Sequence, residues 1–237
     1  MTELFISIDP ETALFARQQL LAWFQTSARS FPWRYDSDPY HVLMAEMMLR
    51  RTQARQVIAV YHRFLQKYPD IFSLDRAPAE EVADILRPLG LEWRAKNFKI
   101  LASELVNCYN GRIPEDRREL MALTGVGPYV AEAVRCFAFG QPAVIMDTNT
   151  VRVAARYFGF SYTPESRRRK QVIQAVSYLM HTGQPASSNY ALLDFAATIC
   201  RAQKPDHAHC PLAPRCAYFR GIQHSQEQQV STSMTTE

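Results

Sequence analysis

The chain has 237 residues, of which 47% are hydrophobic and 21% are charged. This balance is usual for a folded globular protein and excludes a disordered, collagen-like or coiled-coil chain. The 27 basic and 23 acidic residues leave a net charge of +4, which permits a polyanionic partner without requiring one. No apolar stretch approaches the ~20 residues of a membrane helix, and the start lacks a basic signal region. We therefore expect a cytoplasmic protein that is not secreted and has no membrane partner.

Apolar residues recur at helical spacing, and the alternation typical of strands is scarce, so we expect an all-α fold. Asp-Pro pairs predict the first two helix starts, because proline fits a first helical turn. In chain order, the pattern predicts helices over 10–27, 38–50, 52–68, 78–86, 93–109, 115–123, 128–139, from 147 onward, 166–181 and 187–200. Residues 221–237 are mostly polar, which indicates a disordered tail.

The segment from Leu123 to Pro128 joins two of these expected helices by a very short turn. Gly125 and Gly127 would supply the positive φ and the close approach that such a turn needs. Amide groups at the start of the second helix would then face outward, where a phosphate can bind. An ordinary turn between two helices accounts for the glycines equally well.

Asp147 lies 20 residues after Gly127 and directly precedes another expected helix. Taken alone, it is best explained as a helix cap, a position that aspartate fills well. Taken with the hairpin, it has a chemical use. The hairpin would hold a DNA strand, and Asp147 would place a carboxylate beside a sugar carbon of that strand.

Further landmarks lie between Phe31 and Phe219: Pro32-Trp33, Asp38-Pro39-Tyr40, the run from Glu46 to Gln53, the Gly90-Leu91 loop and the terminal cysteines. Together with the hairpin and Asp147, their order and spacing resemble the helix-hairpin-helix DNA glycosylases of the endonuclease III superfamily. The resemblance implies two helical lobes with a DNA cleft between them. Residues 30–140 would form a six-helix barrel lobe with the hairpin, and residues 1–29 and 141–220 a second lobe with a metal loop. It also implies that Asp147 is the essential carboxylate and that the target nucleotide is flipped out of the duplex, because a stacked base cannot be reached. We expect a monomer that binds double-stranded DNA carrying a mismatched or modified base.

Tyr129 stands where the glycosylase/lyases of this family carry a lysine that attacks the sugar and forms a Schiff base. A tyrosine cannot form that imine, so we expect a monofunctional glycosylase without efficient lyase activity. Asp147 would stabilise the oxocarbenium ion, orient a water and leave an abasic site. Tyr129 itself is either an ordinary aromatic residue of a helix face or, as its position favours, a residue that recognises the base.

Glu46 lies on the apolar face of its expected helix, where a carboxylate needs a partner or a function. A buried ion pair with an arginine is one explanation, and contact with the extruded base is the other. Within the superfamily that the chain resembles, adenine DNA glycosylases carry a glutamate at the position of Glu46, and it protonates the leaving purine. Thymine-DNA mismatch glycosylases carry one as well, followed by Leu-Arg-Arg-Thr, and this chain has the same four residues from Leu49 to Thr52.

Three features favour excision of thymine or uracil opposite guanine. Arg50 and Arg51 replace the two glutamines usual in adenine enzymes, Tyr129 resembles the thymine enzymes, and the sequence stops before a domain that reads 8-oxoguanine. One alternative is an adenine DNA glycosylase acting on A:G or A:8-oxoguanine pairs. A second is a non-catalytic sensor of distorted DNA, which the presence of both Asp147 and Glu46 disfavours.

The same resemblance indicates further contacts with DNA. Arg50 and Arg51 fall in a region that enters the duplex and meets the estranged base, and arginine suits the acceptor edge of guanine. Gln53 would fill the gap left by the flipped base, and Trp93 follows a loop that probes DNA in this family. Solvent-facing arginines and a core tryptophan are the alternatives.

Four residues near the end match the C-x6-C-x2-C-x5-C spacing that holds a [4Fe–4S] cluster in this family, namely Cys200, His207, Cys210 and Cys216. The histidine departs from the family pattern, although histidine ligates iron–sulfur clusters in some other proteins. A set of three cysteines and one histidine also suits tetrahedral zinc. A loop that holds no metal is the third alternative. We expect the cluster, in a structural role.

Overall fold

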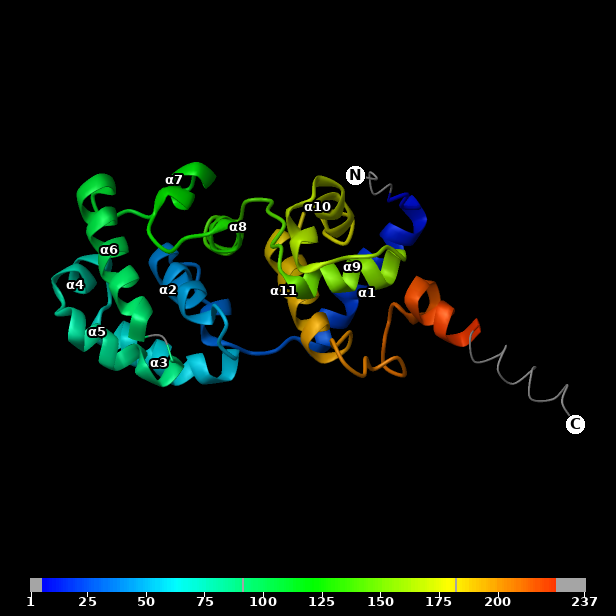
Figure 1. Cartoon of the computed structure of the whole chain (residues 1–237), viewed down its shortest axis with the longest axis horizontal. Helices are drawn as coiled ribbons and strands as arrows, with labels where there is room; N and C mark the ends of the chain where they lie inside the picture. Colours follow the sequence, from blue (N-terminus) through cyan, green and yellow to red (C-terminus); the bar gives the residue numbers. More distant parts are fainter. Residues whose placement is uncertain (1–5, 91, 182, 225–237) are drawn as a thin grey trace, which may run out of the picture. The chain divides into compact units, whose positions relative to one another are not determined.

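The computed structural model describes residues 6–90, 92–181 and 183–224, without the side chains of residues 92 and 93 (Figure 1). The described part contains helices and no strand, which confirms the all-α expectation. Its α-helices are α1 (Pro10–Ser27), α2 (Pro39–Leu49), α3 (Ala54–Lys67), α4 (Ile71–Arg76), α5 (Ala79–Leu86), α6 (Glu92–Tyr109), α7 (Arg117–Ala122), α8 (Pro128–Phe137), α9 (Thr148–Phe158), α10 (Lys170–Ser177) and α11 (Pro185–Thr198). Its 3₁₀ helices are η1 (Pro32–Arg34), η2 (Arg87–Leu89), η3 (Pro164–Arg168) and η4 (Ala213–Arg215). Within the described ranges, no helix combines the length and the apolar character needed to cross a membrane.

Aspartate caps begin the first two long helices at the residues that the Asp-Pro pairs predict. Asp9 accepts a hydrogen bond from the amide of Thr12 at 2.8 Å, and α1 starts at the following proline. Asp38 accepts from the amides of Tyr40 and His41 at 2.8 and 3.1 Å, and α2 starts in the same way. Each cap satisfies amides that the first helical turn leaves without a partner.

Three local predictions differ from the structure. Helix α4 was not predicted, because its six residues are too few to show a helical period. The helix predicted over 166–181 is replaced by η3 and α10, which are separated by Arg169 in an extended conformation. The prediction of disorder from residue 221 is wrong for residues 221–224, which continue a helix from residue 217. Phe219 of that helix packs on His207, with ring centroids 4.7 Å apart, which gives the segment a contact to fold on. The rest of the predicted tail lies outside the described residues.

The contacts divide the chain into two units, and each unit has its own buried core. Unit 1 comprises Met1–Arg29 and Val144–Glu237, and unit 2 comprises Ser30–Ala143. In unit 2, α2 packs against α3 and α8, and every side chain from Val42 to Met48 is buried. The sequence of α2 is accordingly apolar on most sides, and Glu46 is the one charged residue among its buried side chains.

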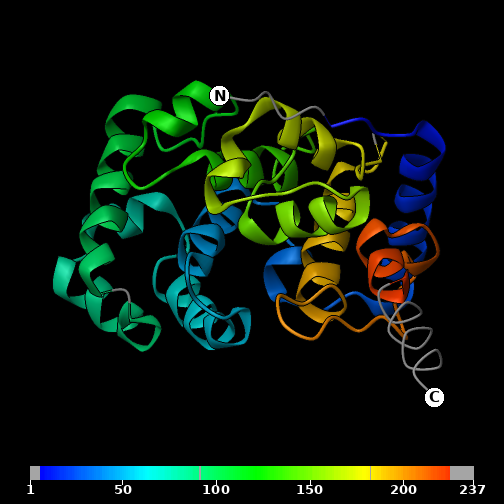
Figure 2. The ribbon, with the colours of Figure 1, turned by 45° about the vertical axis from the view of Figure 1, so that its right-hand side comes forward.

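In unit 1, α11 packs against both α1 and α9 (Figure 2). Leu20, Tyr157, Leu192 and Phe195 belong to the buried cluster between these helices. Asp194 of α11 is fully buried and accepts two bonds from Arg29, one from its amide at 2.9 Å and one from Nε at 2.6 Å. This pair ties the end of α1 to α11, because a buried carboxylate needs hydrogen-bonded partners.

Candidate active site and DNA-contacting residues

Asp147 is the N-cap of α9 in unit 1, and its carboxylate is held by three donors. Oδ1 accepts from the amides of Asn149 and Thr150 at 2.8 and 2.7 Å. Oδ2 accepts from Nδ2 of Asn149 at 2.6 Å, and the amide of Asp147 donates to Oγ1 of Thr150 at 3.0 Å. The half-buried carboxylate is therefore both a helix cap and a charged group in one fixed orientation.

A second set of bonds holds the side chain of Asn149 in turn. Arg152 of α9 is 6% exposed, and its Nη1 donates to Oδ1 of Asn149 at 2.8 Å. Its Nε donates to the carbonyl of Cys200 at 3.0 Å, and its Nη2 to the carbonyl of Ala196 at 2.9 Å. A continuous chain of hydrogen bonds thus runs from Asp147 to the first residue of the cysteine-rich loop.

Glu46 of α2 is 3% exposed, and burial raises its pKa to about 7, while the charge of Arg34 acts in the opposite direction. Its Oε2 atom has no hydrogen-bond partner among the described residues. Glu46 therefore does not form, with any described residue, the buried ion pair with an arginine that was one explanation of its position. A carboxyl group with a pKa near 7 can hold or release a proton at neutral pH, as a general acid must.

The hairpin consists of α7, a turn over residues 123–127 and α8. Gly125 adopts a φ of +83°, and a Cβ there would lie 2.8 Å from Cε of Met47, so both predicted reasons for glycine hold. Gly127 has a φ of −98°, so the prediction of positive φ is wrong at this residue. Gly127 is instead the extended N-cap of α8, and a Cβ there would meet no described atom within 4 Å.

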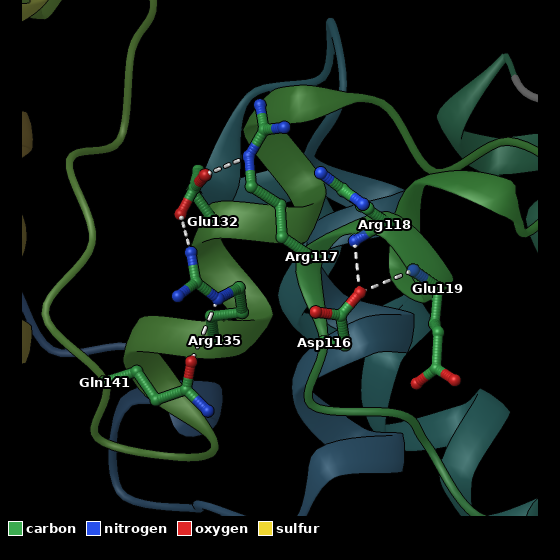
Figure 3. A network of polar contacts seen from close by, with 7 residues as sticks. All are labelled: Asp116, Arg117, Arg118, Glu119, Glu132, Arg135 and Gln141. Atoms are coloured by element: carbon green, nitrogen blue, oxygen red, sulfur yellow. Dashed lines mark hydrogen bonds and ion pairs between the residues drawn. The ribbon is translucent and has the colours of Figure 1, made fainter.

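A network of charged side chains joins the two helices of the hairpin (Figure 3). Both carboxylate oxygens of Glu132 on α8 accept a hydrogen bond, one from Nε of Arg117 at 2.6 Å and one from Nη1 of Arg135 at 2.8 Å. Arg135 also donates from Nε to Gln141 at 2.9 Å. Asp116 caps α7 by accepting from the amides of residues 118 and 119. The bond between Arg117 and Glu132 therefore links α7 to α8 across the turn.

The loop between α2 and α3 carries three of the predicted DNA-contacting residues, and all three are exposed. Arg50 is the C-cap of α2, and its Nη1 donates to the carbonyl of Gly125 at 2.7 Å. Arg51 has a φ of +57°. Gln53 is the N-cap of α3, but its side chain makes no capping bond. The structure therefore brings Arg50 to the hairpin, a contact that the sequence analysis did not anticipate.

The two remaining predicted residues are both at helix starts. Tyr129 is the second residue of α8 and is half-buried. Trp93 is the second residue of α6, but its side chain lies outside the described part of the structure.

All four candidate metal ligands line one hollow of unit 1, which is partly open to solvent. Figure 2 shows the loop that carries them, in orange, leaving the end of α11. Arg156 of α9 contacts two of them: its Nη1 donates to Sγ of Cys200 at 3.6 Å, and its carbonyl accepts from Sγ of Cys216 at 3.5 Å. Burial raises the pKa of Cys210 to about 11.

The arrangement of the four candidate ligands can be compared with what zinc and a [4Fe–4S] cluster each require. Among the described residues, no three His, Cys, Asp or Glu side chains are grouped as a single metal ion requires. Zinc needs four ligands within about 2.3 Å of one atom. A [4Fe–4S] cluster is a much larger body, so its ligands stand further apart around one space. The four candidate ligands line one hollow, and three thiols with one imidazole are donors that either group accepts.

Residues 44–177 match the model of the HhH-GPD superfamily base excision DNA repair protein. The chain belongs to this family. The two units, the hairpin and the capped Asp147 described above are thus features of an HhH-GPD protein, which confirms the family resemblance drawn from the sequence.

Relatives of this HhH-GPD protein include thymine- and uracil-excising enzymes. The chain is 38% identical to the thymine/uracil-DNA glycosylase of Methanothermobacter thermautotrophicus, over 84% of this chain and 91% of the relative. It is 36% identical to the thymine-DNA glycosylase of Aeropyrum pernix, over 86% of this chain and 93% of the relative. The adenine DNA glycosylase of Buchnera aphidicola is 30% identical, over 88% of this chain but only 59% of the relative.

Solved structures resemble the HhH-GPD chain in the same order. A thermostable thymine-DNA glycosylase superposes with a TM-score of 0.84 at 36% identity, covering 89% of this chain and 98% of that one. A non-covalent endonuclease III–DNA complex superposes with a TM-score of 0.79 at 26% identity, covering 92% and 100%. These likenesses confirm the predicted helical fold.

Two positions around Asp147 escaped the sequence analysis. Asn149 and Arg152 orient the carboxylate, yet neither residue type is unusual in the first turn of a helix. A signal was present in the spacing, because Asn149 and Arg152 are three residues apart and so share one helix face. The contact of Arg152 with the loop at Cys200 spans 48 residues and has no local signature.

Proposed function

We propose that this protein is a monofunctional DNA glycosylase that hydrolyses the N-glycosidic bond of thymine or uracil opposite guanine in double-stranded DNA, leaving an abasic site. The observation that carries the proposal is the likeness to thymine- and uracil-DNA glycosylases over most of both chains. Those relatives match along more of their length than the adenine-specific relative does. The proposed substrate also implies action wherever the DNA lies, in the cytoplasm or nucleoid.

In the proposed reaction, the bond between the base and the sugar C1′ breaks, and its electron pair leaves with the base. The sugar becomes an oxocarbenium ion, which the negative charge of Asp147 stabilises. The three donors on the carboxylate keep that charge in place, so little reorganisation is needed as the cation forms. A water then bonds to C1′ and gives its proton to Asp147.

Glu46 would supply the proton that the departing base needs. At neutral pH a sizeable fraction of the Glu46 side chains is protonated, because burial raises the pKa to about 7. A neutral carboxyl can donate to the base as negative charge develops on it, and its unpartnered Oε2 leaves bonding capacity for such a contact.

The substrate proposal is tested with a panel of duplexes that carry one G:T, G:U, A:G, A:8-oxoguanine or normal pair. We expect strand cleavage from G:T and G:U duplexes only after alkali, because hydrolysis leaves an intact abasic strand. Excision of adenine in preference to thymine and uracil would establish the adenine alternative. Binding to mispaired duplexes without release of any base would establish the sensor.

The proposed lack of lyase activity leads to a gain-of-function prediction at Tyr129. We expect Tyr129→Lys to form a covalent DNA–protein adduct when borohydride is added to a reaction with G:U duplex, because an amine would then stand where the family's lyases carry one. The wild-type protein should give no such adduct. Tyr162→Lys, which adds an amine at an exposed tyrosine elsewhere in the chain, is the control and should give none. Equal trapping by Tyr129→Lys and by the control would contradict the assignment of this position.

We further propose that Cys200, His207, Cys210 and Cys216 hold a [4Fe–4S] cluster in the hollow of unit 1. Support comes from their spacing and from their arrangement around a common space. When bound, the cluster would join the loop to the protein by metal–ligand bonds, which is a structural function. The residues that face it, including Arg156, would hold the loop against α9.

The histidine ligand can be checked by metal analysis. We expect the purified protein to contain iron and sulfide, and His207→Ala to lose a large part of both. His207→Cys, which restores the family pattern, should retain them. His209→Ala is the matched control, because His209 is exposed and is paired with Asp206. Zinc as the sole metal, or iron content that depends on His209 and not on His207, would contradict the proposed ligand set.

A further inference from the structure

Arg50 is held at both its side chain and its backbone, which is unusual for an exposed residue at a helix end. Its Nη1 donates to the carbonyl of Gly125 in the hairpin turn at 2.7 Å. Its own carbonyl accepts from Nη1 of Arg94 at 2.7 Å and from Oγ1 of Thr52 at 3.3 Å. Arg94 belongs to α6 and is 4% exposed, so the backbone of Arg50 is fixed to the interior of unit 2.

A second contact with α6 holds the hairpin turn at Thr124, the residue before Gly125. Glu104 of α6 accepts from the amide of Thr124 at 2.7 Å and from Oγ1 of Thr124 at 2.6 Å. The turn is therefore bracketed by a carboxylate at Thr124 and by a guanidinium at Gly125. Among the described residues, the amides of Gly125 and Gly127 have no acceptor, so both remain available to an anionic ligand.

Arg51 differs from Arg50 in both its backbone and its side chain. Its backbone lies in the left-handed region, at a φ of +57°, which is unfavourable for a residue with a Cβ. Its side chain is exposed and makes no hydrogen bond or ion pair within the described residues. Unfavourable backbone conformations are retained mainly where function requires them. Arg51 follows the extended C-cap of α2, and the five donors of its guanidinium remain unused within the described residues.

The three arginines also form a local concentration of positive charge. Burial lowers the pKa of Arg94, and the charges of Arg50 and Arg51 add to that effect. Such a group is stabilised by a polyanion. Arg50 and Arg94 each donate to a backbone carbonyl, so two of the three guanidinium groups are already bonded within the protein.

We propose that Arg50 is a positioning residue that couples the hairpin to the loop between α2 and α3, and that Arg51 is the arginine of the pair that contacts DNA directly. This inference rests on the proposed function only in taking DNA as the ligand. It separates two residues that the sequence motif Leu-Arg-Arg-Thr presents as equivalent. In this proposal the hairpin binds the DNA strand. Arg50 fixes the position of the loop that carries Arg51 relative to the hairpin turn.

The test begins with the DNA-free protein, so that it does not depend on which base is excised. Amide hydrogen exchange of residues 123–130 is compared among wild type, Arg50→Leu, Arg50→Lys and Arg51→Leu. We expect Arg50→Leu to speed exchange in this segment by about tenfold, because a charged hydrogen bond to the turn is lost. Arg50→Lys should restore part of the protection, and Arg51→Leu should leave it unchanged. Arg76→Leu, which removes an exposed charge at the end of α4, is the control for net charge.

Binding to matched and G:T duplexes completes the test. Arg50→Leu should weaken both to the same degree without changing the salt dependence of Kd, because Arg50 touches no phosphate. Arg51→Leu should weaken binding and lower the slope of log Kd against log salt by about one. Unchanged exchange in Arg50→Leu, or a salt slope that falls in Arg50→Leu and not in Arg51→Leu, would overturn the inference. The proposed substrate could fail on its own panel of duplexes while the exchange result stands.

Discussion

Asp147→Asn is expected to lower the single-turnover rate of base excision from a G:T duplex by at least about 10³-fold. The amide has no negative charge to stabilise the oxocarbenium ion, and it is too weak a base to accept a proton from water. Asparagine is as good a helix cap as aspartate, so α9 should keep its start and the protein its stability. The rate is measured at saturating enzyme, and binding of the same duplex is measured separately.

Asp9→Asn is the matched control for this change. Asp9 caps α1 in the same unit and accepts from the amide of Thr12. Both variants exchange a capping carboxylate for a capping amide, so a general effect of the exchange would appear in both. A near-normal rate in Asp147→Asn would show that Asp147 is only a cap, and the proposed mechanism would be wrong.

The second large effect is expected at Glu46, in the pH dependence of stability. The pKa of Glu46 rises from an ordinary value of 4.5 to about 7 in the folded protein, through burial. The stability that protonated Glu46 provides is therefore fully present below pH 4.5 and is lost as the pH rises through 7. That shift corresponds to about 3 kcal/mol of unfolding free energy.

Glu46→Gln removes the titration. We expect the wild-type protein to lose about 3 kcal/mol relative to Glu46→Gln between pH 4.5 and pH 8. Urea unfolding of both proteins at several pH values gives this difference directly. Glu80→Gln, an exposed glutamate of α5, is the control, and its difference from wild type should stay nearly constant. A difference for Glu46→Gln that does not change with pH would contradict a buried, titrating carboxyl.

Glu46 should also determine how the rate of base excision depends on pH. If Glu46 gives a proton to the leaving base, the rate at saturating DNA falls as the pH rises through about 7. Glu46→Gln should be slower at neutral pH and should lack this fall. An identical fall in both proteins would assign the titration to another group.

The elements set by local rules were predictable from the sequence. The Asp-Pro pairs placed the starts of α1 and α2, because capping and the preference of proline for the first turn involve neighbouring residues only. The spacing of the cysteines and His207 likewise placed four residues around one hollow. Local patterns of this kind carry their meaning within a few residues.

Contacts between distant segments were not predictable in this way. The bond from Arg50 to Gly125 spans 75 residues, and the motif around Arg50 suggested a contact with DNA instead. Gly127 was expected to need a positive φ, but the turn places that requirement on Gly125 alone. The burial of Glu46 was inferred from its apolar helix face, whereas the lack of a partner for Oε2 depends on how the other helices pack around α2.

The central claim is that water, and no protein amine, attacks the sugar after Asp147 has stabilised the cation. Mass spectrometry of the first turnover on a G:U duplex, with and without borohydride, tests it most directly. The account predicts free uracil, an intact abasic strand and no protein–DNA adduct for wild type, and an adduct for Tyr129→Lys under the same conditions. A borohydride-stable bond between the wild-type protein and the sugar, formed in step with uracil release, would contradict it.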